Sequence, residues 1–344
     1  MVEVVTFGCR INAYESEVIK EKLQNYDHLI VVNTCAVTGE AERQCRQMVR
    51  KLKREHPDDE IIVTGCSAQF QADKYASMSE VSLVLGNKEK KEIEKYVEAI
   101  FADKKQVGDI FADDACDNFL VTGFEGKQKA FVQVQQGCDH RCSYCIVPYV
   151  RGRNRSVAEE IIIRQIQNLV ANGYQEICLT GIDLCSYKPS FSKLVSSILT
   201  KIPELPVLTF GSLDPAAVDD EFIRIINDNP RIASFFHFSV QSGDNGVLKK
   251  MGRRHTREKV MDICRKIRKI RPDVRFGADF ICGFPTETLE AFNNTCNLVG
   301  EAGINKLHVF PYSERSGTPA AKMMQIPMSE RRRRAEILRK LSEE

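Results

Sequence analysis

Three cysteines lie within eight residues in the segment GCDHRCSYC, residues 137–145. Thiolates of Cys138, Cys142 and Cys145 on one loop can hold three irons of a cubane iron–sulfur cluster and leave the fourth iron without a protein ligand. Such an open position distinguishes a reactive metal centre from a structural one. S-adenosylmethionine (SAM) can chelate that iron, and one-electron reduction of the bound SAM then yields a 5′-deoxyadenosyl radical. Tyr144 is placed to pack against the adenine of SAM.

Two other interpretations of this motif stay open. The three thiols could bind zinc together with a distant fourth ligand, or they could be core residues. A disulfide framework is a poor explanation for the 13 cysteines of the chain, because their number is odd and the N-terminus has no basic leader or cleavage site.

The elements around the motif favour the reactive centre, because a zinc knuckle needs no such surroundings. Alternating strand and helix patterns from residue 128 onward predict six β/α units, which form an open (β/α)6 partial barrel. The first predicted strand ends just before the motif, and the chemistry of such barrels lies at the carboxyl ends of their strands. The strands are predicted at 130–135, 176–180, 207–211, 235–241, 275–282 and 306–310, and the helices at 157–172, 190–201, 219–227, 256–270 and 289–300.

A smaller α/β region comes before the barrel. Apolar runs at 2–7, 29–32, 61–64 and 81–85 alternate with helical patterns at 13–26, 40–56 and 88–101, which predicts a small parallel, doubly wound sheet with Asn12 as the first N-cap. We therefore expect an N-terminal domain over residues 1–101, a linker rich in Asp and Gly over 102–127, a barrel over 128–328 and a basic terminal helix over 329–344.

Three further cysteines introduce a family resemblance. The segments TFGCRINAYES, VVNTCAVT and VTGCSAQ contain Cys9, Cys35 and Cys66, and with the loop motif they resemble the radical SAM methylthiotransferases over nearly all of the chain. The resemblance implies that these three thiols bind the auxiliary [4Fe–4S] cluster of that family. Independently of it, each cysteine follows a predicted parallel strand, so all three should converge at one sheet edge. Core cysteines at strand ends are the alternative.

The resemblance continues at later strand ends, in segments 179–187, 210–215, 237–256, 279–288 and 308–323. It implies that SAM is bound there by residues near those strand ends, with Gly283 letting the backbone approach the adenine. These residues are Thr180, Gly181, Ser212, Gln241 and Gly283.

The substrate follows from the branch of the family. Two branches modify the adenosine just 3′ of the anticodon in tRNA, with a threonylcarbamoyl or an isopentenyl group on N6, and a third modifies an aspartate of a ribosomal protein. IVPYVRGRNRS (residues 146–156) and SLDP resemble the threonylcarbamoyladenosine branch. Its Arg151, Arg153 and Arg155 suit a substrate with phosphates and a carboxylate, although a solvated surface is the alternative.

The resemblance thus implies an enzyme with two [4Fe–4S] clusters and SAM that adds a methylthio group to C2 of the adenosine at tRNA position 37. The tRNA anticodon loop and a reductant such as flavodoxin or ferredoxin are the implied partners. The rival hypotheses are methylthiolation in one of the other two branches, a zinc-stabilised RNA-binding module without catalysis, and an inactive truncated form.

Composition and charge agree with a soluble protein that meets RNA. Hydrophobic residues make up 43% and charged residues 28% of the chain, and no run approaches the roughly 20 apolar residues of a membrane span. We therefore expect a cytoplasmic protein without a membrane partner. Residues 1–127 carry 17 Lys and Arg against 23 Asp and Glu, whereas residues 128–344 carry 32 against 24, so only the second segment suits a polyanion.

The family usually continues into a small C-terminal β-barrel called TRAM, which grips tRNA. This chain stops at Glu344, where that barrel would begin. We therefore expect it to lack the TRAM domain.

Overall fold

The computed structural model describes residues 2–98, 103–112, 116, 120–124 and 128–342. The chain forms two compact units: unit 1 consists of Met1–Asp139 and Ile146–Tyr174, and unit 2 of His140–Cys145 and Gln175–Glu344. None of the helices described is both long and apolar enough to cross a membrane. The domain boundaries expected near residues 101 and 128 stay a prediction, and the ends of the helices expected at 88–101 and 329–344 lie outside the described residues.

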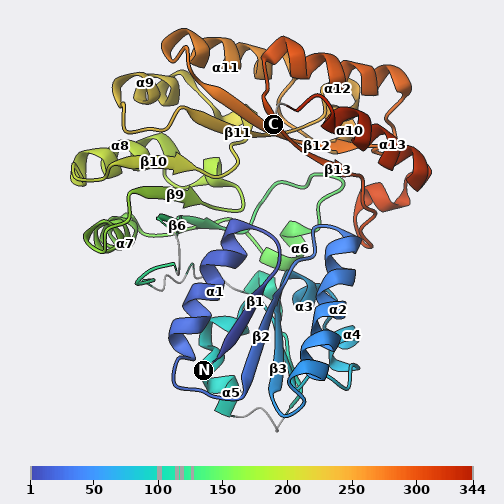
Figure 1. Cartoon of the computed structure of the whole chain (residues 1–344). Helices are drawn as coiled ribbons and strands as arrows, with labels where there is room; N and C mark the ends of the chain where they lie inside the picture. The colour runs from blue at the N-terminus through green and yellow to red at the C-terminus, as the bar shows by residue number, and fades with distance from the viewer. Residues whose placement is uncertain (1, 99–102, 113–115, 117–119, 125–127, 343–344) are drawn as a thin grey trace. The chain divides into compact units, whose positions relative to one another are not determined.

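Unit 1 is built on a five-stranded parallel sheet whose strands adjoin in chain order (Figure 1). The strands are β1 (Glu3–Thr6), β2 (Leu29–Thr34), β3 (Glu60–Gly65), β4 (Leu83–Leu85) and β5 (Lys105–Gln106). The helices between them are α1 (Arg10–Lys22), α2 (Gly39–Glu55), α3 (Cys66–Phe70), α4 (Ala72–Ala76), the 3-10 turn η1 (Glu89–Glu92) and α5 (Ile93–Glu98). Strand β5 lies within the segment expected to be a linker.

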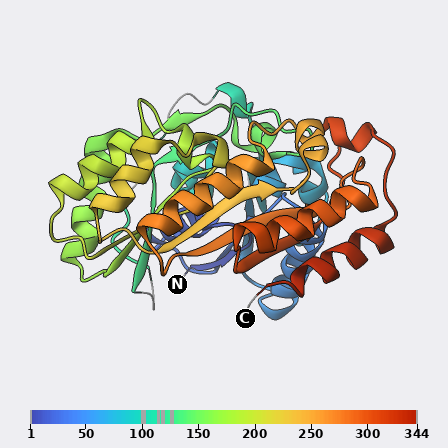
Figure 2. The same ribbon diagram turned by 90° about the horizontal axis from the view of Figure 1, so that it is seen from above.

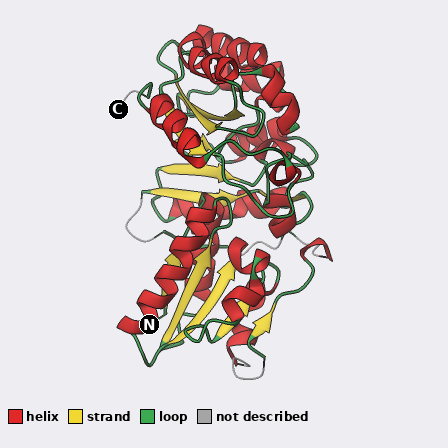
Figure 3. Cartoon of the chain, turned by 90° about the vertical axis from the view of Figure 1, so that its right-hand side faces the viewer, coloured by secondary structure: helices red, strands yellow, loops and turns green. Residues whose placement is uncertain are grey.

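Helices cover both faces of this sheet, as Figure 3 shows. Val49 and Leu52 of α2 pack on one face, against side chains such as Ile30 of β2. Ile19 of α1 and Ile93 of α5 pack on the opposite face with Leu23 and Leu29. Because buried parallel strands need cover on both sides, this packing confirms the predicted doubly wound sheet.

The first helix begins earlier than its sequence pattern predicts. Cys9, not Asn12, is the N-cap of α1, and the Cys9 side chain makes no capping hydrogen bond. The Asn12 amide instead donates to the carbonyl oxygens of Phe7 (2.7 Å) and Thr34 (3.0 Å). The predicted cap is therefore wrong, because the side chain of Asn12 ties the ends of β1 and β2 together.

The remaining described elements of unit 1 follow the sheet in the chain. They are η2 (Ile110–Ala112), β6 (Lys129–Gln133), β7 (Gln135–Gln136), α6 (Val147–Arg151), β8 (Arg155–Ser156) and α7 (Glu159–Ala171). Strands β7 and β8 pair antiparallel.

Unit 2 continues the alternation of strands and helices that β6 and α7 begin. Its strands are β9 (Glu176–Thr180), β10 (Val207–Phe210), β11 (Phe235–Gln241), β12 (Arg275–Cys282) and β13 (Lys306–Pro311). Its helices are η3 (Leu184–Ser186), α8 (Phe191–Lys201), η4 (Pro215–Ala217), α9 (Asp220–Asp228), α10 (Asn245–Met251), α11 (Arg257–Ile270), α12 (Leu289–Ala302), η5 (Pro319–Lys322) and α13 (Met328–Arg339). This order confirms the predicted α/β fold class.

Strand pairing in unit 2 is parallel throughout the described ladders: β9 pairs with β10, and β12 lies between β11 and β13. Helices α11 and α12 lie side by side (Figure 2). Capping side chains fix where the helices begin, because each accepts the N–H of the third residue of its helix. These caps are Ser190, Asp219, Asp244, Thr256 and Thr288.

Candidate functional site

Cys9, Cys35 and Cys66 lie at the carboxyl ends of three neighbouring strands of unit 1. Cys35 directly follows β2, Cys66 directly follows β3, and Cys9 comes shortly after β1. Burial, and after it the nearby thiols of Cys66 and Cys9, raise the pKa of the Cys35 thiol to about 12. Because neighbouring parallel strands end at the same edge of a sheet, the structure brings these three cysteines together as the strand pattern predicts.

Two glycines allow the strand ends to approach so closely. Gly65 has φ +93°, and a Cβ there would lie 2.5 Å from the carbonyl oxygen of Thr34. Gly8 has φ +99°, and a Cβ there would lie 2.9 Å from the sulfur of Cys35. The residues that precede Cys9 and Cys66 therefore have to be glycine.

A buried ion network borders these thiols within unit 1. Arg151 is only 1% exposed, and its Nε donates to the sulfur of Cys66 at 3.0 Å. The other guanidinium nitrogens of Arg151 bind both carboxylate oxygens of Glu15 and the side-chain oxygen of Asn12. The ammonium of Lys90 reaches Glu15 at 2.6 Å and the Asn87 oxygen at 2.7 Å.

The charges of this network fit an anionic group held by the three thiols. Burial acts to raise the pKa of Glu15, but Arg151 and Lys90 outweigh it and hold the pKa at about 2. Burial lowers the pKa of Lys90 to about 8, which still leaves it mostly protonated at pH 7. Two cations therefore face one carboxylate. A cubane of formal charge about +2 on three thiolates carries about −1, which would balance the excess cation.

Of the three arginines predicted to bind substrate, one is exposed. Arg153 lies at the surface, Arg155 is 8% exposed with its Nη2 donating to the carbonyl oxygen of Arg151, and Arg151 binds Glu15. The structure thus gives Arg151 partners inside unit 1, and the role of all three in substrate binding stays a prediction.

The loop cysteines are held by backbone hydrogen bonds. In unit 1 the Cys138 N–H donates to the Gly152 carbonyl at 3.1 Å. The preceding Gly137 has φ +71°, and a Cβ there would lie 1.8 Å from the carbonyl oxygen of Arg153. Any larger residue at position 137 would therefore displace the loop at the first cysteine.

In unit 2 the turn with Cys142 and Cys145 is anchored through Ser143. The Ser143 N–H donates to Met251 and its hydroxyl to Lys250, at 2.9 and 2.8 Å, so the turn is fixed to the end of α10. The Cys145 N–H donates to the carbonyl of Cys142 at 3.0 Å. These backbone hydrogen bonds therefore help to hold the two thiols at a fixed spacing.

Arg253 supplies positive charge beside this turn. One of its guanidinium nitrogens lies 3.8 Å from the sulfur of Cys142, and another donates to Asp214 at 3.1 Å and to the Ser239 carbonyl at 2.7 Å. The Nε of Arg253 is buried and has no hydrogen-bond partner among the described residues. A buried donor without a partner costs about 1–3 kcal/mol. An anionic, sulfur-rich group beside Arg253 would accept a hydrogen bond from this Nε–H and balance the guanidinium charge, so the position fits such a group.

Tyr144 packs into an apolar cluster of unit 2. Its ring lies against the group formed by Met251, Phe284 and Tyr312. Burial raises the pKa of its phenol well above the usual value. Its role at the adenine stays a prediction.

The residues predicted to bind SAM lie at or after strand ends of unit 2. Thr180 ends β9 and Gly181 follows it, Ser212 follows β10 and Gln241 ends β11. The Ser212 hydroxyl is 2.6 Å from the hydroxyl of Ser239 and donates to Asp279 at 3.1 Å. Gln241 has φ +74°, a strained value for a residue with a side chain. Their placement agrees with a ligand at the carboxyl ends, and the individual contacts stay predictions.

Gly283 follows β12 with φ +73° and has a structural reason of its own. A Cβ at this position would lie 2.5 Å from Cγ of Arg331. Its N–H donates to the carboxylate of Glu287 at 2.7 Å. The close approach observed at Gly283 is thus to α13, whereas an approach to adenine stays a prediction.

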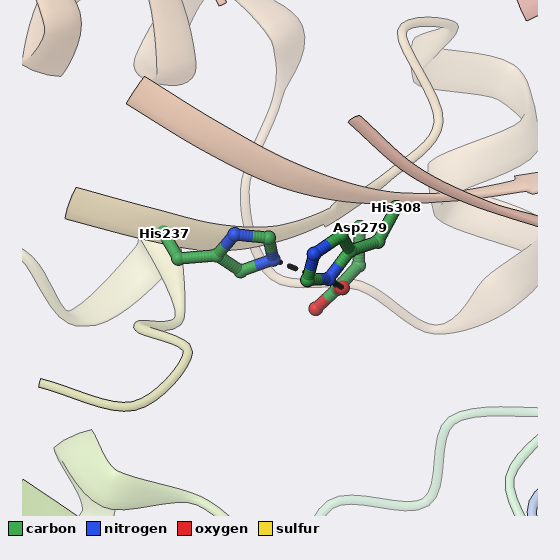
Figure 4. Close-up of side chains that lie close together, drawn as sticks. All are labelled: His237, Asp279 and His308. Atoms are coloured by element: carbon green, nitrogen blue, oxygen red, sulfur yellow. Dashed lines mark hydrogen bonds and ion pairs between the residues drawn. The ribbon is translucent and has the colours of Figure 1, made fainter. Parts of the chain in front are cut away.

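Three polar side chains that sequence reasoning did not assign meet across β11, β12 and β13 (Figure 4). Nε2 of His237 lies 2.9 Å and Nδ1 of His308 lies 3.3 Å from the same carboxylate oxygen of Asp279. Both imidazoles hold the pKa of Asp279 far below its usual range, against the effect of burial. Gly277 makes room, because a Cβ there would lie 2.4 Å from Nδ1 of His237. Within the cluster His308 is exposed, so its imidazole is accessible as a hydrogen-bonding group.

The other cysteines are not part of either set. Cys45, Cys178, Cys264 and Cys282 are buried, and Cys116, Cys185 and Cys296 are partly exposed. Burial raises the pKa of Cys185 to about 12, so this thiol is unreactive as a nucleophile near neutral pH.

Comparisons with known proteins agree with these two sets of cysteines. Residues 132–299 match the Radical SAM superfamily, and residues 1–86 match the Uncharacterized protein family UPF0004. The first match contains the loop cysteines, and the second contains Cys9, Cys35 and Cys66.

Relatives extend over nearly the whole chain. The Threonylcarbamoyladenosine tRNA methylthiotransferase MtaB of Rickettsia prowazekii is 49% identical over 98% of this chain and 82% of its own length. The protein of the same name from Bacillus subtilis is 34% identical over 92% of this chain and 74% of its own. The tRNA-2-methylthio-N(6)-dimethylallyladenosine synthase of Carboxydothermus hydrogenoformans is 35% identical over 97% of this chain and 81% of its own.

Solved structures share the fold. The radical S-adenosylmethionine methyltransferase TsrM of Kitasatospora setae, with cobalamin and a [4Fe-4S] cluster bound, superposes with a TM-score of 0.65 at 14% identity, covering 91% of this chain and 69% of its own. At this identity the likeness supports the fold alone.

Proposed function

Because this chain belongs to the radical SAM methylthiotransferases that modify tRNA, we propose that it converts N6-threonylcarbamoyladenosine at tRNA position 37 to its 2-methylthio derivative. The observation that best supports this proposal is that Cys9, Cys35 and Cys66 lie together at one edge of the unit 1 sheet. Three thiolates can hold a cubane cluster, so this second set of thiols supports the auxiliary cluster that the family resemblance implies. The names of the relatives from Rickettsia prowazekii and Bacillus subtilis support the threonylcarbamoyl substrate.

Two sets of thiols divide the work in this proposal. Cys138, Cys142 and Cys145 would hold the cluster to which SAM binds, and Cys9, Cys35 and Cys66 would hold the auxiliary cluster. When bound, these clusters and SAM supply the C–H cleavage and the sulfur that is transferred. The region through residue 101 would act as the methylthiotransferase domain, and residues 128–328 as the radical SAM domain.

The side chains of the protein would position these groups and keep them dry. Thr180, Gly181, Ser212 and Gln241 stand at strand ends where SAM is expected, and Arg153 is the exposed arginine available to a phosphate or carboxylate of the substrate. No protein group has to act as a general base, because hydrogen is removed from C2 as an atom. The partners would be the tRNA anticodon loop and a one-electron reductant such as flavodoxin or ferredoxin, in the cytoplasm.

The substrate can be tested with anaerobically reconstituted protein, SAM, reductant and tRNA from a strain that lacks methylthiolation. Digested tRNA is analysed by liquid chromatography and mass spectrometry. We expect a methylthio mass increase on threonylcarbamoyladenosine and none on isopentenyladenosine. An increase on isopentenyladenosine alone would assign the chain to the other tRNA branch.

A non-catalytic zinc protein predicts a different composition of the same preparation. Two cubanes correspond to about eight irons per chain. About one zinc per chain without iron, together with no 5′-deoxyadenosine from SAM, would overturn the proposal.

A further inference from the structure

The strongest unexplained feature of unit 1 is a buried arginine that points at a predicted cluster ligand. We propose that Arg151, held by Glu15, is a positioning residue of the auxiliary cluster: it hydrogen-bonds the Cys66 sulfur and raises the reduction potential of that cluster. The inference rests on the proposed function, because it presupposes a cluster at Cys9, Cys35 and Cys66. It concerns what the surrounding protein does to that cluster.

The contacts of the Arg151 guanidinium leave its Nε–H as the donor that faces the Cys66 sulfur. Its two terminal nitrogens are occupied by Glu15 and Asn12, which fixes the plane of the group. The remaining Nε–H is directed at the sulfur of Cys66 at 3.0 Å. A lysine ammonium could not satisfy these three directions at once, because its donors are not arranged in a planar fork.

Burial makes the charge of Arg151 effective. The residue is 1% exposed, so water and salt screen its field weakly. Asn87 adds a second restraint, since its amide donates to the Val150 carbonyl at 2.7 Å and keeps the end of α6 next to Cys66. The positive charge is therefore held at the sulfur by the fold, without the freedom of a surface side chain.

A hydrogen bond and a positive charge at a cluster sulfur favour the reduced cluster, because reduction adds negative charge there. Hydrogen bonds to sulfur, net charge and solvent exposure are the general determinants of cluster potential. Glu15 works in the opposite direction, because its carboxylate offsets part of the charge on Arg151 and Lys90. The potential should thus depend on Arg151 and Glu15 with opposite signs.

This sign difference separates an electrostatic role from a merely structural one. Damage to the packing around Cys66 would shift the potential in an arbitrary direction, or in the same direction for both variants. Removal of a cation should make the cluster harder to reduce, and removal of the anion should make it easier.

The experiment isolates the auxiliary cluster in the full chain in which Cys138, Cys142 and Cys145 are replaced by alanine. Arg151→Gln and Glu15→Gln are introduced separately, the cluster is reconstituted anaerobically, and reduction is followed by electron paramagnetic resonance against potential. We expect Arg151→Gln to lower the equilibrium constant for reduction about tenfold, which is about 59 mV for one electron. We expect Glu15→Gln to raise it by a similar factor.

Two further variants control the interpretation. Arg43→Gln removes the same charge from an exposed helix position that pairs with Glu40, and we expect no shift in potential. Arg151→Lys keeps the charge but loses the fork, so its shift should be smaller than that of Arg151→Gln. It also supplies the test should the glutamine variant fail to fold.

The outcomes distinguish this inference from the function on which it rests. A cluster that forms with an unchanged potential in Arg151→Gln and Glu15→Gln, or that shifts in one direction in both, overturns the role of Arg151 and leaves the proposed function standing. A failure of the parent chain without the loop cysteines to bind any iron overturns the auxiliary site and with it the proposed function.

Discussion

The two sets of three cysteines are brought together in different ways, one by closeness in the sequence and the other by the fold of the sheet. Cys138, Cys142 and Cys145 lie within eight residues of one loop, so the chain itself limits how far apart they can be. Cys9, Cys35 and Cys66 follow three separate strands, and only the register of the parallel ladder brings them together. The loop set is thus a local feature of the sequence, whereas the strand-end set is a product of the folded sheet. The second set should therefore be the one that strain in the sheet damages.

The largest effect should come from the loop set. Cys142→Ala removes one of three ligands, so we expect complete loss of 5′-deoxyadenosine formation from SAM, measured by chromatography under reducing anaerobic conditions. Cys264→Ala is the matched control, because that thiol is buried in α11 and should cost about 1 kcal/mol of stability without loss of cleavage. Cleavage that survives Cys142→Ala would contradict the assignment of the loop.

Loss of a cysteine from the strand-end set should abolish formation of the methylthio nucleoside but not the cleavage of SAM. In Cys35→Ala we expect loss of the methylthio nucleoside and of about four irons per chain, while 5′-deoxyadenosine still forms. Iron analysis and mass spectrometry of the tRNA digest measure the two effects on one preparation. Equal loss of cleavage in Cys35→Ala and Cys142→Ala would mean that the two sets do not act separately.

Acid should weaken unit 1 through Glu15. Its pKa of about 2 in the fold lies below the usual 4.5, so the stability it contributes is present above pH 4.5 and is lost as the pH falls toward 2. The difference corresponds to about 3 kcal/mol. Denaturant unfolding of cluster-free chain at several pH values should show a shallower acid dependence for Glu15→Gln. The exposed Glu40→Gln should keep the wild-type slope, and equal slopes for all three chains would contradict this expectation.

The smallest effect concerns the backbone that joins the strand ends. Gly65→Ala places a Cβ 2.5 Å from the oxygens of Asn33 and Thr34 at positive φ, which should lower the free energy of unfolding by about 2 kcal/mol. Gly300→Ala, in helix α12 with open space at the Cβ position, should raise it by about 0.5–1 kcal/mol. A neutral Gly65→Ala would show that the sheet tolerates strain at this edge.

Sequence patterns predicted the regular elements well where they were local. The strands at 176–180, 235–241 and 275–282 agree with β9, β11 and β12 residue for residue, because a glycine-containing turn follows each of them. The convergence of Cys9, Cys35 and Cys66 followed from strand order in a parallel sheet. The N-cap of α1 was wrong because the Asn12 amide is used across two strand ends.

Long-range pairs were not predictable in the same way. Arg151 meets Glu15 across 136 positions of the chain, and nothing in a single sequence specifies that an arginine in the arginine-rich segment 151–155 is buried. The cluster of His237, Asp279 and His308 depends on the relative register of β11, β12 and β13. Sequence alone places each residue on its strand and leaves the partners across the ladder unspecified.

The parallel ladder of unit 1 also sets where the chain tolerates a change of length. Adding one residue inside β2 or β3 would turn every later side chain of that strand to the other face and carry Cys35 or Cys66 away from its neighbours. The turns that lead into these strands, near His28 and Asp59, lie at the amino-terminal ends of the strands, away from the cysteines at the carboxyl ends. A short peptide tag or a fluorescent reporter inserted at residues 56–59 should leave iron loading intact, which makes this turn the natural handle for labelling the protein.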